Sequence, residues 1–465
     1  MHACTPTSIS RADFPPDFRW GCATSAYQIE GAVAQGGRGE SIWDRFTRIP
    51  GRVRDGSNGD IACDHYHLWA QDLDLAAALG LNAYRFSIAW PRVLPGGRGA
   101  ANQAGLDFYS RLVDGMLARG LEPWATLYHW DLPQTLQEDG GWAARGCVAA
   151  FEEYTDLITR TLGDRVRHWI THNEPWCTGM HGHHDGTHAP GVKDWGTALR
   201  VCHHVLLSHG CAVRVIRANV PGACAGITLS LHPISAASER SVDVAAAVRH
   251  DGLRNRWFLG PLYARGYPED VWRRVAHDAP PVLPGDLETI ATRTDFLGIN
   301  YYFPEVVAHA AGAGPLDARV VMAAEVKRTA IGWQVSPAAL VRLLTRVAAD
   351  YHPQDIVVTE NGATYDDVPD ASGTIEDIER QDFIVRHVEA LRQAIAQGVP
   401  VRGYFVWSLM DNFEWAEGYT RRFGLVHVDF HTQRRRMKRS GHWYRSFLKP
   451  QAPPDRVPPP DSEPS

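Results

Sequence analysis

The stretch HYHLWAQDLDLAAALGLNAYRFSIAW, residues 65–90, carries one copy of the pattern that decides the fold. Its first part, His65–Leu79, has apolar side chains at helical spacing and is closed by Gly80. Those apolar positions are Leu68, Trp69, Leu73, Leu75 and Leu79. Its second part, Asn82–Trp90, is short and nearly continuous in apolar and aromatic side chains, which is typical of a strand buried on both faces of a parallel sheet. The stretch therefore predicts a helix followed by a buried strand.

Short runs of the same kind recur along the chain. With Asn82–Trp90 they are Phe18–Thr24, Glu122–Trp130, Arg167–Asn173, Ala223–Leu231, Asp295–Tyr302, Asp355–Glu360 and Arg402–Ser408. The intervals between them exceed the dozen or so residues that a parallel crossover needs, and Gln103–Ala118 and Ala144–Thr161 again have helical spacing. Strands alternating with helices in this way predict an α/β protein, a single (β/α)8 TIM barrel with elaborated βα loops.

The length and composition are compatible with one such barrel. The chain has 465 residues, 44% of them hydrophobic, and large barrels reach this size through insertions. We expect one catalytic barrel domain over residues 1–449. The Pro-rich tail, residues 450–465, has few apolar side chains to bury, so we expect it to be disordered.

The charge pattern argues against a nucleic-acid partner. The net charge is −6, and the one strongly basic run, Arg434 to Arg439, is interpreted as a solvated surface turn. No stretch approaches 18 apolar residues, so we expect no membrane-spanning helix and no membrane partner. Eight scattered cysteines without a CxxC pair, and a start without a secretory signal, favour reduced thiols and a cytoplasmic location.

Unusual polar and aromatic residues fall at the ends of the predicted strands. They are Gln28, Glu30, Arg85, His129, Trp130, Asp131, Asn173, Glu174, Asn300, Tyr301, Tyr302, Glu360, Asn361, Trp407, Asp411, Glu414 and Trp415. Each alone has an ordinary structural explanation, such as a helix cap or a hydrogen-bonded core residue. In a barrel, however, all of them converge on one rim, where so much polarity without a ligand would leave many groups unsatisfied. A concave site with oriented polar groups and aromatic walls suits a polyhydroxylated substrate.

Two glutamates at the rim supply the chemistry of glycoside hydrolysis. One carboxyl protonates the leaving oxygen, and the other attacks the anomeric carbon or activates water. Glu174 and Glu360 are the candidates. Asn173 is placed to orient a sugar 2-hydroxyl, and Arg85 to keep a neighbouring carboxylate ionised. The sequence does not give the separation of the carboxylates, so retention and inversion both stay open at this point.

At these residues the chain resembles glycoside hydrolase family 1, the β-glucosidase family, over about residues 14–447. The matching stretches are FRWGCATSAYQIEG (18–31), YRFSIAWPR (84–92), YHWDLP (128–133), THNEP (171–175), VTENG (358–362) and VWSLMDNFEW (406–415). Six long matches in the right order make coincidence very improbable.

The resemblance implies a retaining double displacement, with Glu174 as the acid/base and Glu360 as the nucleophile. It implies a sugar pocket lined by Gln28, His129, Trp130, Asn173, Tyr302, Trp407, Glu414 and Trp415. It also implies that Arg85 and Asn300 support the nucleophile, that Tyr302 donates a hydrogen bond to it, and that Trp333 forms a wall of the leaving-group subsite.

These roles lead to a specific functional hypothesis. We expect an exo-acting β-glucosidase for terminal, non-reducing β-D-glucosyl residues of small glycosides and short oligosaccharides, with side activity on β-galactosides and β-fucosides. A carboxylate at Glu414 would repel a 6-phosphate, which favours unphosphorylated sugars. No cofactor and no metal are expected. The oligomeric state, the natural leaving group and the preference between glucoside and galactoside are not predicted.

Two alternatives belong to other classes of protein. A non-catalytic sugar-binding protein could retain the pocket, although only chemistry requires both Glu174 and Glu360. A metal-dependent hydrolase could use a histidine-rich segment whose histidines are His181, His183, His184 and His188. We favour the interpretation of that segment as a polar loop at the site entrance. Thr171-His172, in place of the family's more usual aromatic residue, predicts more polar surroundings beneath Glu174.

Overall fold

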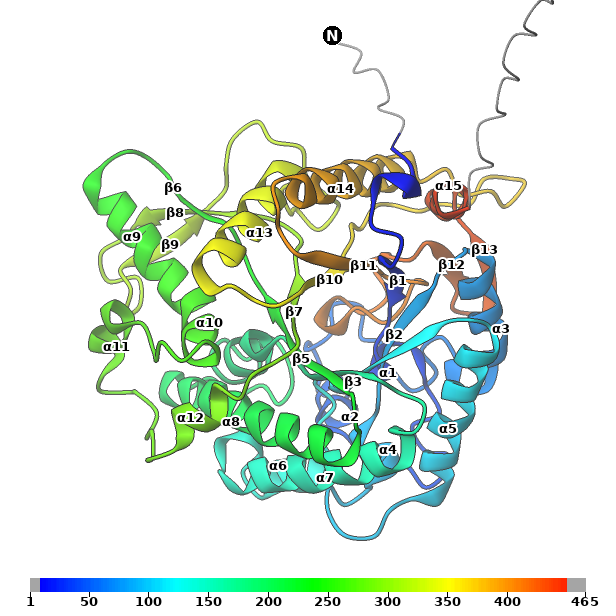
Figure 1. Ribbon diagram of the computed structural model, residues 1–465, viewed down its shortest axis with the longest axis horizontal. Helices are drawn as coiled ribbons and strands as arrows, with labels where there is room; N and C mark the ends of the chain where they lie inside the picture. The colour runs from blue at the N-terminus through cyan, green and yellow to red at the C-terminus, as the bar shows by residue number, and fades with distance from the viewer. Residues whose placement is uncertain (1–8, 450–465) are drawn as a thin grey trace, which may run out of the picture.

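The computed structural model describes residues 9–449, in which eight parallel strands form a closed barrel (Figure 1). In barrel order they are β1 (Arg19–Ala23), β11 (Val401–Trp407), β10 (Ile356–Asn361), β7 (Phe296–Asn300), β5 (Cys224–Ser230), β4 (His168–Asn173), β3 (Glu122–Tyr128) and β2 (Ala83–Ser87). Each predicted run overlaps one of these strands, and the predicted barrel is confirmed. The predicted disordered tail, residues 450–465, lies outside the described residues.

Helices connect successive strands and cover the outside of the barrel (Figure 1). The main connecting helices are α3 (His65–Ala78), α5 (Gln103–Ala118), α7 (Gly146–Leu162), α8 (Trp195–Asn219), α13 (Pro337–Tyr351) and α14 (Ile378–Ala396), and α15 (Arg439–Leu448) follows β11. The three segments with helical spacing correspond to α3, α5 and α7 within two residues at each end.

The loops between strands and helices carry further structure that the sequence analysis does not predict. The short helices are α1 (Ala26–Ile29), α2 (Ile42–Thr47), α4 (Trp90–Val93), α6 (Gln134–Glu138), α9 (Ser241–Asp251), α10 (Trp257–Leu262), α11 (Glu269–Val275) and α12 (Asp286–Ile290). A three-stranded sheet joins β6 (Ile234–Ala236), β8 (Glu305–His309) and β9 (Ala318–Val321), and lies beside α9 at one side of the barrel in Figure 1. The strands β12 (Val426–Asp429) and β13 (Arg434–Met437) form an antiparallel pair. No helix among residues 9–449 is long and apolar enough to cross a membrane.

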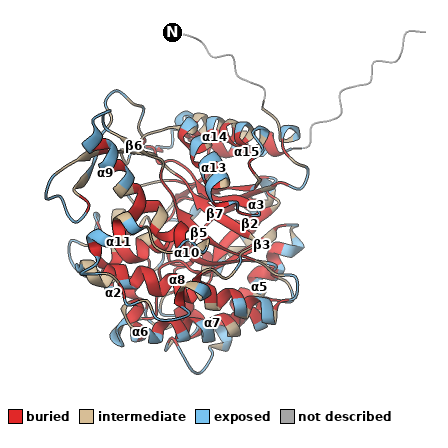
Figure 2. Ribbon diagram, turned by 60° about the vertical axis from the view of Figure 1, so that its left-hand side comes forward, coloured by how far each residue is buried: buried red, intermediate tan, exposed pale blue. Residues whose placement is uncertain are grey.

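The apolar core has two layers. The larger layer lies between the barrel and its helices, where buried residues form the inner faces of the helices in Figure 2. The smaller layer fills the barrel itself, and in it the indole of Trp124 packs 5.2 Å from the ring of Phe296 and 5.3 Å from that of Phe405. A Cβ on Gly21 would lie 2.4 Å from the Phe405 ring, so only glycine leaves room for this aromatic plug. The plug closes the end of the barrel at which the strands begin.

The interpretation of Arg434 to Arg439 as a solvated turn is wrong. Arg435 is buried against Asp72 at 2.9 Å, and Lys438 is fully buried between Asp367 and Asp411, at 2.5 and 2.6 Å. The run encloses β13, which brings its cations to carboxylates that stand far away in the chain. Nothing in the local sequence reveals those partners.

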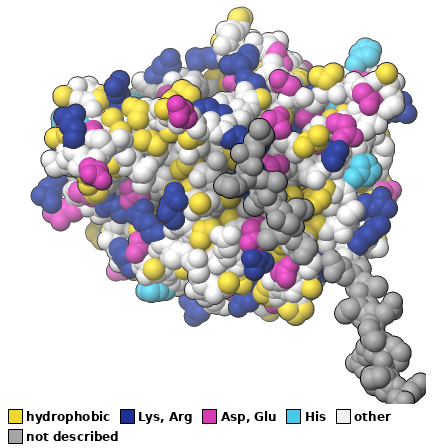
Figure 3. Space-filling view, turned by 90° about the horizontal axis from the view of Figure 1, so that it is seen from above, with side chains coloured by type: hydrophobic (Ala, Val, Ile, Leu, Met, Phe, Trp, Pro, Cys, Tyr) yellow, Lys and Arg dark blue, Asp and Glu magenta, His cyan; other side chains and the backbone are white. Residues whose placement is uncertain are grey.

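The outer surface has no field of one sign on the face drawn in Figure 3, where basic and acidic side chains are interspersed. This pattern agrees with the modest net charge of −6.

Replacing Lys438 by Ala should destabilise the fold strongly, because it leaves two buried carboxylates without their shared cation. Asp367 retains Arg380 as a partner, and Asp411 retains Arg422. We therefore expect the free energy of unfolding to fall by about 3 kcal/mol, which is at the low end for a broken buried ion pair. Urea unfolding of Lys438→Ala and of the exposed control Arg434→Ala measures it. A Lys438→Ala midpoint equal to that of the control would contradict the ion-pair argument.

Candidate active site

The polar end of the barrel is where the strands finish, and two of those strands are irregular there. The pairing of β4 with β5 shifts register between Ile170 and Asn173, and that of β10 with its neighbours shifts after Val358. Such bulges bend a strand and redirect its side chains. Here they precede Glu174 and Glu360, the two predicted catalytic carboxylates.

Three residues at the same rim have strained backbone conformations. Glu174, Trp130 and Trp415 have left-handed φ angles of 49°, 79° and 48°. A bulky side chain adopts this region only where the surrounding structure enforces it, at a cost of about 1–3 kcal/mol each. Three predicted site residues therefore hold conformations that the fold maintains against local preference.

A buried arginine at the centre of the barrel organises the two glutamate strands. Arg85 on β2 is fully buried, and its Nη1 donates to Glu360 Oε1 at 2.5 Å. Its Nη2 donates to Asn173 Oδ1 at 2.6 Å, and its Nε to Thr126 Oγ1 at 3.2 Å. The guanidinium thus contacts Glu360 directly and fixes β2, β3, β4 and β10 relative to one another.

The two carboxylates have different partners. Glu360 accepts hydrogen bonds from the Arg85 cation and from Tyr302 Oη at 2.6 Å, both of which favour the ionised form. Burial raises the pKa of Glu360 to about 7, Glu174 acts in the same direction, and Arg85 and Tyr302 oppose this rise. Glu174 accepts from neutral donors, Asn300 Nδ2 at 2.7 Å and the Cys177 thiol at 2.9 Å. Where two close carboxylates share a proton, this arrangement favours the anion on Glu360.

The position of Asn300 differs from the prediction that it supports Glu360. Its side-chain nitrogen contacts Glu174 Oε1 at 2.7 Å and Asn173 Oδ1 at 3.1 Å. The reason is that Thr359 Oγ1 donates to Asn300 Oδ1 at 2.8 Å, which turns the amide nitrogen toward β4. Asn300 is therefore a partner of Glu174.

The amide of Asn173 connects this centre to the next strand. Asn173 Nδ2 donates to His129 Nε2 at 3.0 Å, and Trp130 Nε1 donates to the Asn173 carbonyl at 2.9 Å. Burial, reinforced by the charge of Arg85, holds the pKa of His129 well below its usual range, so the imidazole is neutral and can accept this bond.

Gln28 and Glu414 lie on the opposite side of the site. Gln28 Nε2 donates to Asn412 Oδ1 at 3.0 Å and to the Phe413 carbonyl at 2.8 Å, and it lies 3.5 Å from Glu414 Oε2. Burial and the nearby Glu360 raise the pKa of Glu414 to about 8. The side chain of Glu414 therefore lies in surroundings that lack a compensating cation.

Aromatic side chains form the walls. Trp415 packs 4.6 Å from Trp130 and 5.9 Å from His129, and His129 lies 6.0 Å from Trp407, all as ring-centroid distances. Trp333 stands apart from this group, next to Tyr302 at 5.1 Å and partly exposed. The site thus has a deep aromatic side and a separate, more open one.

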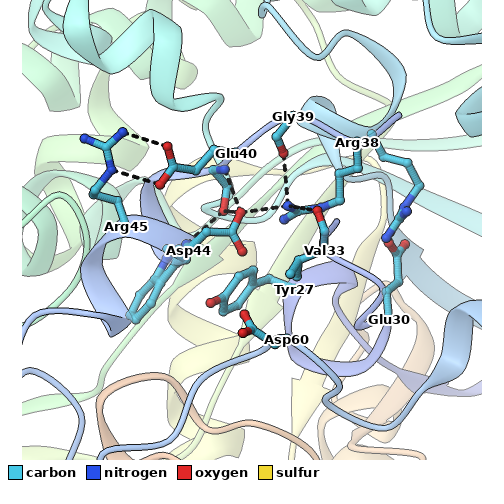
Figure 4. A network of polar contacts seen from close by, with 12 residues as sticks. Tyr27, Glu30, Val33, Arg38, Gly39, Glu40, Asp44, Arg45 and Asp60 are labelled. Atoms are coloured by element: carbon cyan, nitrogen blue, oxygen red, sulfur yellow. Dashed lines mark hydrogen bonds and ion pairs between the residues drawn. The ribbon is translucent and has the colours of Figure 1, made fainter. Parts of the chain in front are cut away.

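Polar contacts on the N-terminal loop hold the Trp415 side in place. Trp43 packs 4.6 Å from Trp415 and lies on α2, next to Asp44. Asp44 pairs with Arg38 at 2.7 Å and caps α2 through Ser41, while Glu40 pairs with Arg45 on the outer side (Figure 4). The network fixes α2 and, through it, one wall of the site.

The histidine-rich segment packs beside Trp130 without gathering its histidines. His181 pairs with Asp185 at 2.8 Å, His183 contacts the Thr178 carbonyl at 2.8 Å, and His188 packs 5.3 Å from Trp130. His184 packs 4.7 Å from Trp195. Within residues 9–449, no three histidine, cysteine, aspartate or glutamate side chains are grouped as metal ligands.

The side chains of Thr171 and His172, just before Asn173, make polar contacts with α8. Thr171 Oγ1 and His209 Nδ1 are 2.7 Å apart, and His172 Nε2 and Ser208 Oγ are 2.8 Å apart, so both pairs link β4 to α8.

The contact of Cys177 with Glu174 was not predicted from the sequence. The thiol follows Glu174 by three residues, at the start of a π-helical turn, Cys177–His181. Its proximity in sequence was visible, but the turn that points it at the carboxylate was not. The contact of Asn412 with Gln28 was not predicted either, because the two residues lie 384 positions apart in the sequence.

Comparisons with known proteins agree with this geometry. The sequence model of "Glycosyl hydrolase family 1" matches residues 10–452. A 1,4-beta-D-glucan glucohydrolase of Thermotoga neapolitana is 44% identical over 94% of this chain and 98% of its own length. A bifunctional beta-D-glucosidase/beta-D-fucosidase of Bifidobacterium breve is 42% identical over 94% of this chain and 98% of its own length. The structure of the Thermotoga maritima beta-glucosidase in complex with deoxynojirimycin superposes with a TM-score of 0.92, at 43% identity over 94% of this chain and 98% of that one.

Replacing Tyr302 by Phe should raise the pKa of Glu360 by about 1, because it removes one of the donors that stabilise the carboxylate. The neighbouring Tyr301 donates to the Ser336 carbonyl at 2.7 Å, so Tyr301→Phe is the matched control. A ¹³C NMR titration of labelled glutamate carboxyls measures both. An unchanged pKa of Glu360 in Tyr302→Phe would show that the hydrogen bond from Tyr302 does not stabilise the ionised carboxylate.

Proposed function

The chain belongs to glycosyl hydrolase family 1, and from this premise we propose that it is a retaining exo-β-glucosidase. It removes terminal, non-reducing β-D-glucosyl residues from small glycosides and short β-linked oligosaccharides. The observation that carries this proposal is the pair of buried carboxylates, Glu174 and Glu360, linked through Asn173, Arg85 and Asn300 but held by partners of different charge. One carboxylate next to a cation and one next to neutral donors is the division of labour that double displacement requires.

In the first step, Glu360 attacks the anomeric carbon while Glu174 gives its proton to the glycosidic oxygen, and the leaving group departs. In the second step, Glu174 takes a proton from water, the water oxygen attacks the anomeric carbon, and glucose and the Glu360 carboxylate are released. Arg85 and Tyr302 stabilise the carboxylate before attack and after release. Since Glu360 must be ionised to attack, kcat/KM should fall as the pH falls through its raised pKa.

Sugar binding follows from the chemistry of the pocket walls. Gln28, His129, Asn173 and Glu414 present acceptors and donors for the hydroxyl groups, and the indoles of Trp407 and Trp415 cover C–H surface. Trp333, on the more open side, contacts the leaving group. The Bifidobacterium relative is named for both glucosidase and fucosidase activity, which supports extending the proposal to β-fucosides, and we extend it to β-galactosides as well.

We also propose a cytoplasmic location. The described cysteines, Cys22, Cys63, Cys147, Cys177, Cys202, Cys211 and Cys224, are free thiols, which supports a reducing compartment.

Glu360→Ala should lose nearly all turnover on every β-glucoside. Glu174→Ala should lose about 10²–10⁴-fold in kcat/KM on cellobiose, whose leaving group needs a proton, but far less on 2,4-dinitrophenyl β-glucoside. The exposed control Glu153→Ala should match the wild type on both substrates. Equal losses of Glu174→Ala on the two substrates would argue against its role as the acid.

A substrate panel with product analysis tests the function as a whole. We expect hydrolysis of aryl β-glucosides and cellobiose, slower cleavage of β-galactosides and β-fucosides, and β-glucose as the first anomer seen by ¹H NMR. A chelator should leave these rates unchanged. Initial release of α-glucose would exclude retention, and binding without turnover would favour a non-catalytic sugar-binding protein.

A further inference from the structure

A second buried arginine lies beside the site and plays no part in the proposed reaction. Arg254 stands in a π-helical turn, Gly252–Arg256, and only 6% of its surface is exposed. Its guanidinium carbon lies 4.2 Å from the ring centroid of Trp176, which is itself partly exposed. Single π-helical turns of this kind are rare and are often found at functional sites.

The hydrogen bonding of this guanidinium is incomplete. Its Nη2 donates to His232 Nε2 at 2.5 Å and to Ser230 Oγ at 3.1 Å. Its Nε lies 3.8 Å from Glu305 Oε1, beyond hydrogen-bonding distance, and its buried Nη1 has no partner among the described residues. A buried cation with an unmet donor costs stability, so the chain would gain from an acceptor at this position.

The charges around Arg254 come from several elements. Glu305 on β8 also accepts from His250 Nε2 at 2.6 Å and lies 3.4 Å from His232 Nδ1, so its carboxylate is shared among several groups. Burial lowers the pKa of Arg254, and Glu305, Cys177 and Glu174 act in the opposite direction. The guanidinium is thus only partly neutralised by the protein.

Aromatic contacts place Arg254 on the open side of the site. Its partner His232 packs 4.6 Å from Phe303, and Phe303 stacks 4.9 Å from Trp333. Trp176, which covers the guanidinium, follows Glu174 by two residues. Side-chain contacts therefore connect the cation to Trp333 through His232 and Phe303, and Trp176 connects it to the loop of Glu174.

We propose that Arg254 recognises a carboxylate on the leaving group, so that the preferred substrates are β-glucosides of acidic aglycones. This inference rests on the proposed function and deepens it. A guanidinium binds carboxylate through charge-assisted hydrogen bonds, and in water-excluded surroundings such bonds discriminate strongly against a neutral isostere. Nη1 is buried and the partly exposed Trp176 lies over the guanidinium, so the proposal requires the Trp176 ring to move aside when the leaving group binds.

Two pairs of nearly isosteric substrates test the proposal. They are the 3- and 4-carboxyphenyl β-D-glucosides and the corresponding carbamoylphenyl β-D-glucosides. In at least one pair, we expect the wild type to have a kcat/KM on the order of tenfold higher for the carboxylate, a preference that weakens as NaCl is raised. A wild-type ratio near one in both pairs would overturn the proposal without any variant. Turnover of 4-nitrophenyl β-D-glucoside, measured alongside, reports separately on the proposed function.

Three variants assign the preference to a residue. Arg254→Met should abolish it while leaving turnover of the neutral substrates within a few-fold of wild type, and Arg254→Lys should keep part of it because the charge remains. The control Arg273→Met removes one cation from the exposed surface and should keep the full preference. A preference that survives in a folded Arg254→Met would refute the assignment, and would mean that another group recognises the carboxylate.

Discussion

The buried guanidinium of Arg85 is the interaction on which the site depends. A cation at the centre of a barrel is costly unless every donor finds an acceptor. Here the acceptors are Glu360, Asn173, Thr126 and the Thr359 carbonyl, which come from three different strands. The same contacts that make the charge tolerable therefore fix the relative positions of the strands that carry both glutamates.

The rest of the rim is arranged around this charge. The bulges in β4 and β10 turn Glu174 and Glu360 toward the axis, and the left-handed backbone of Trp130 and Trp415 turns two indoles to the same side. Such conformations persist only in rigid surroundings. The capped helix α2 and its Arg38–Asp44 pair supply this rigidity for Trp415, through the packing of Trp43.

The barrel was predictable because buried parallel strands are nearly continuous apolar runs, and runs such as Asn82–Trp90 are plain in the sequence. The rim residues were predictable because they follow those strands and match known motifs. The predictions that failed concern residues whose hydrogen-bond or ion-pair partners lie far away in the sequence. Lys438 looked like a surface cation because its acceptors stand 71 and 27 residues away. The family resemblance assigned Asn300 to Glu360, its neighbour across the sheet. The Thr359 hydroxyl that turns its amide nitrogen toward Glu174 cannot be inferred from sequence. No motif or pattern in the sequence pointed to Arg254.

The aromatic plug of Trp124, Phe296 and Phe405 has a consequence for how a long substrate is handled. With the barrel blocked below the glutamates, the sugar pocket is a dead end, and whatever enters must leave by the same mouth. A polymer cannot thread through and advance to its next linkage. The polysaccharide must therefore dissociate completely after each cut, so its degradation by this protein is distributive. Free glucose competes with incoming substrate for the same passage.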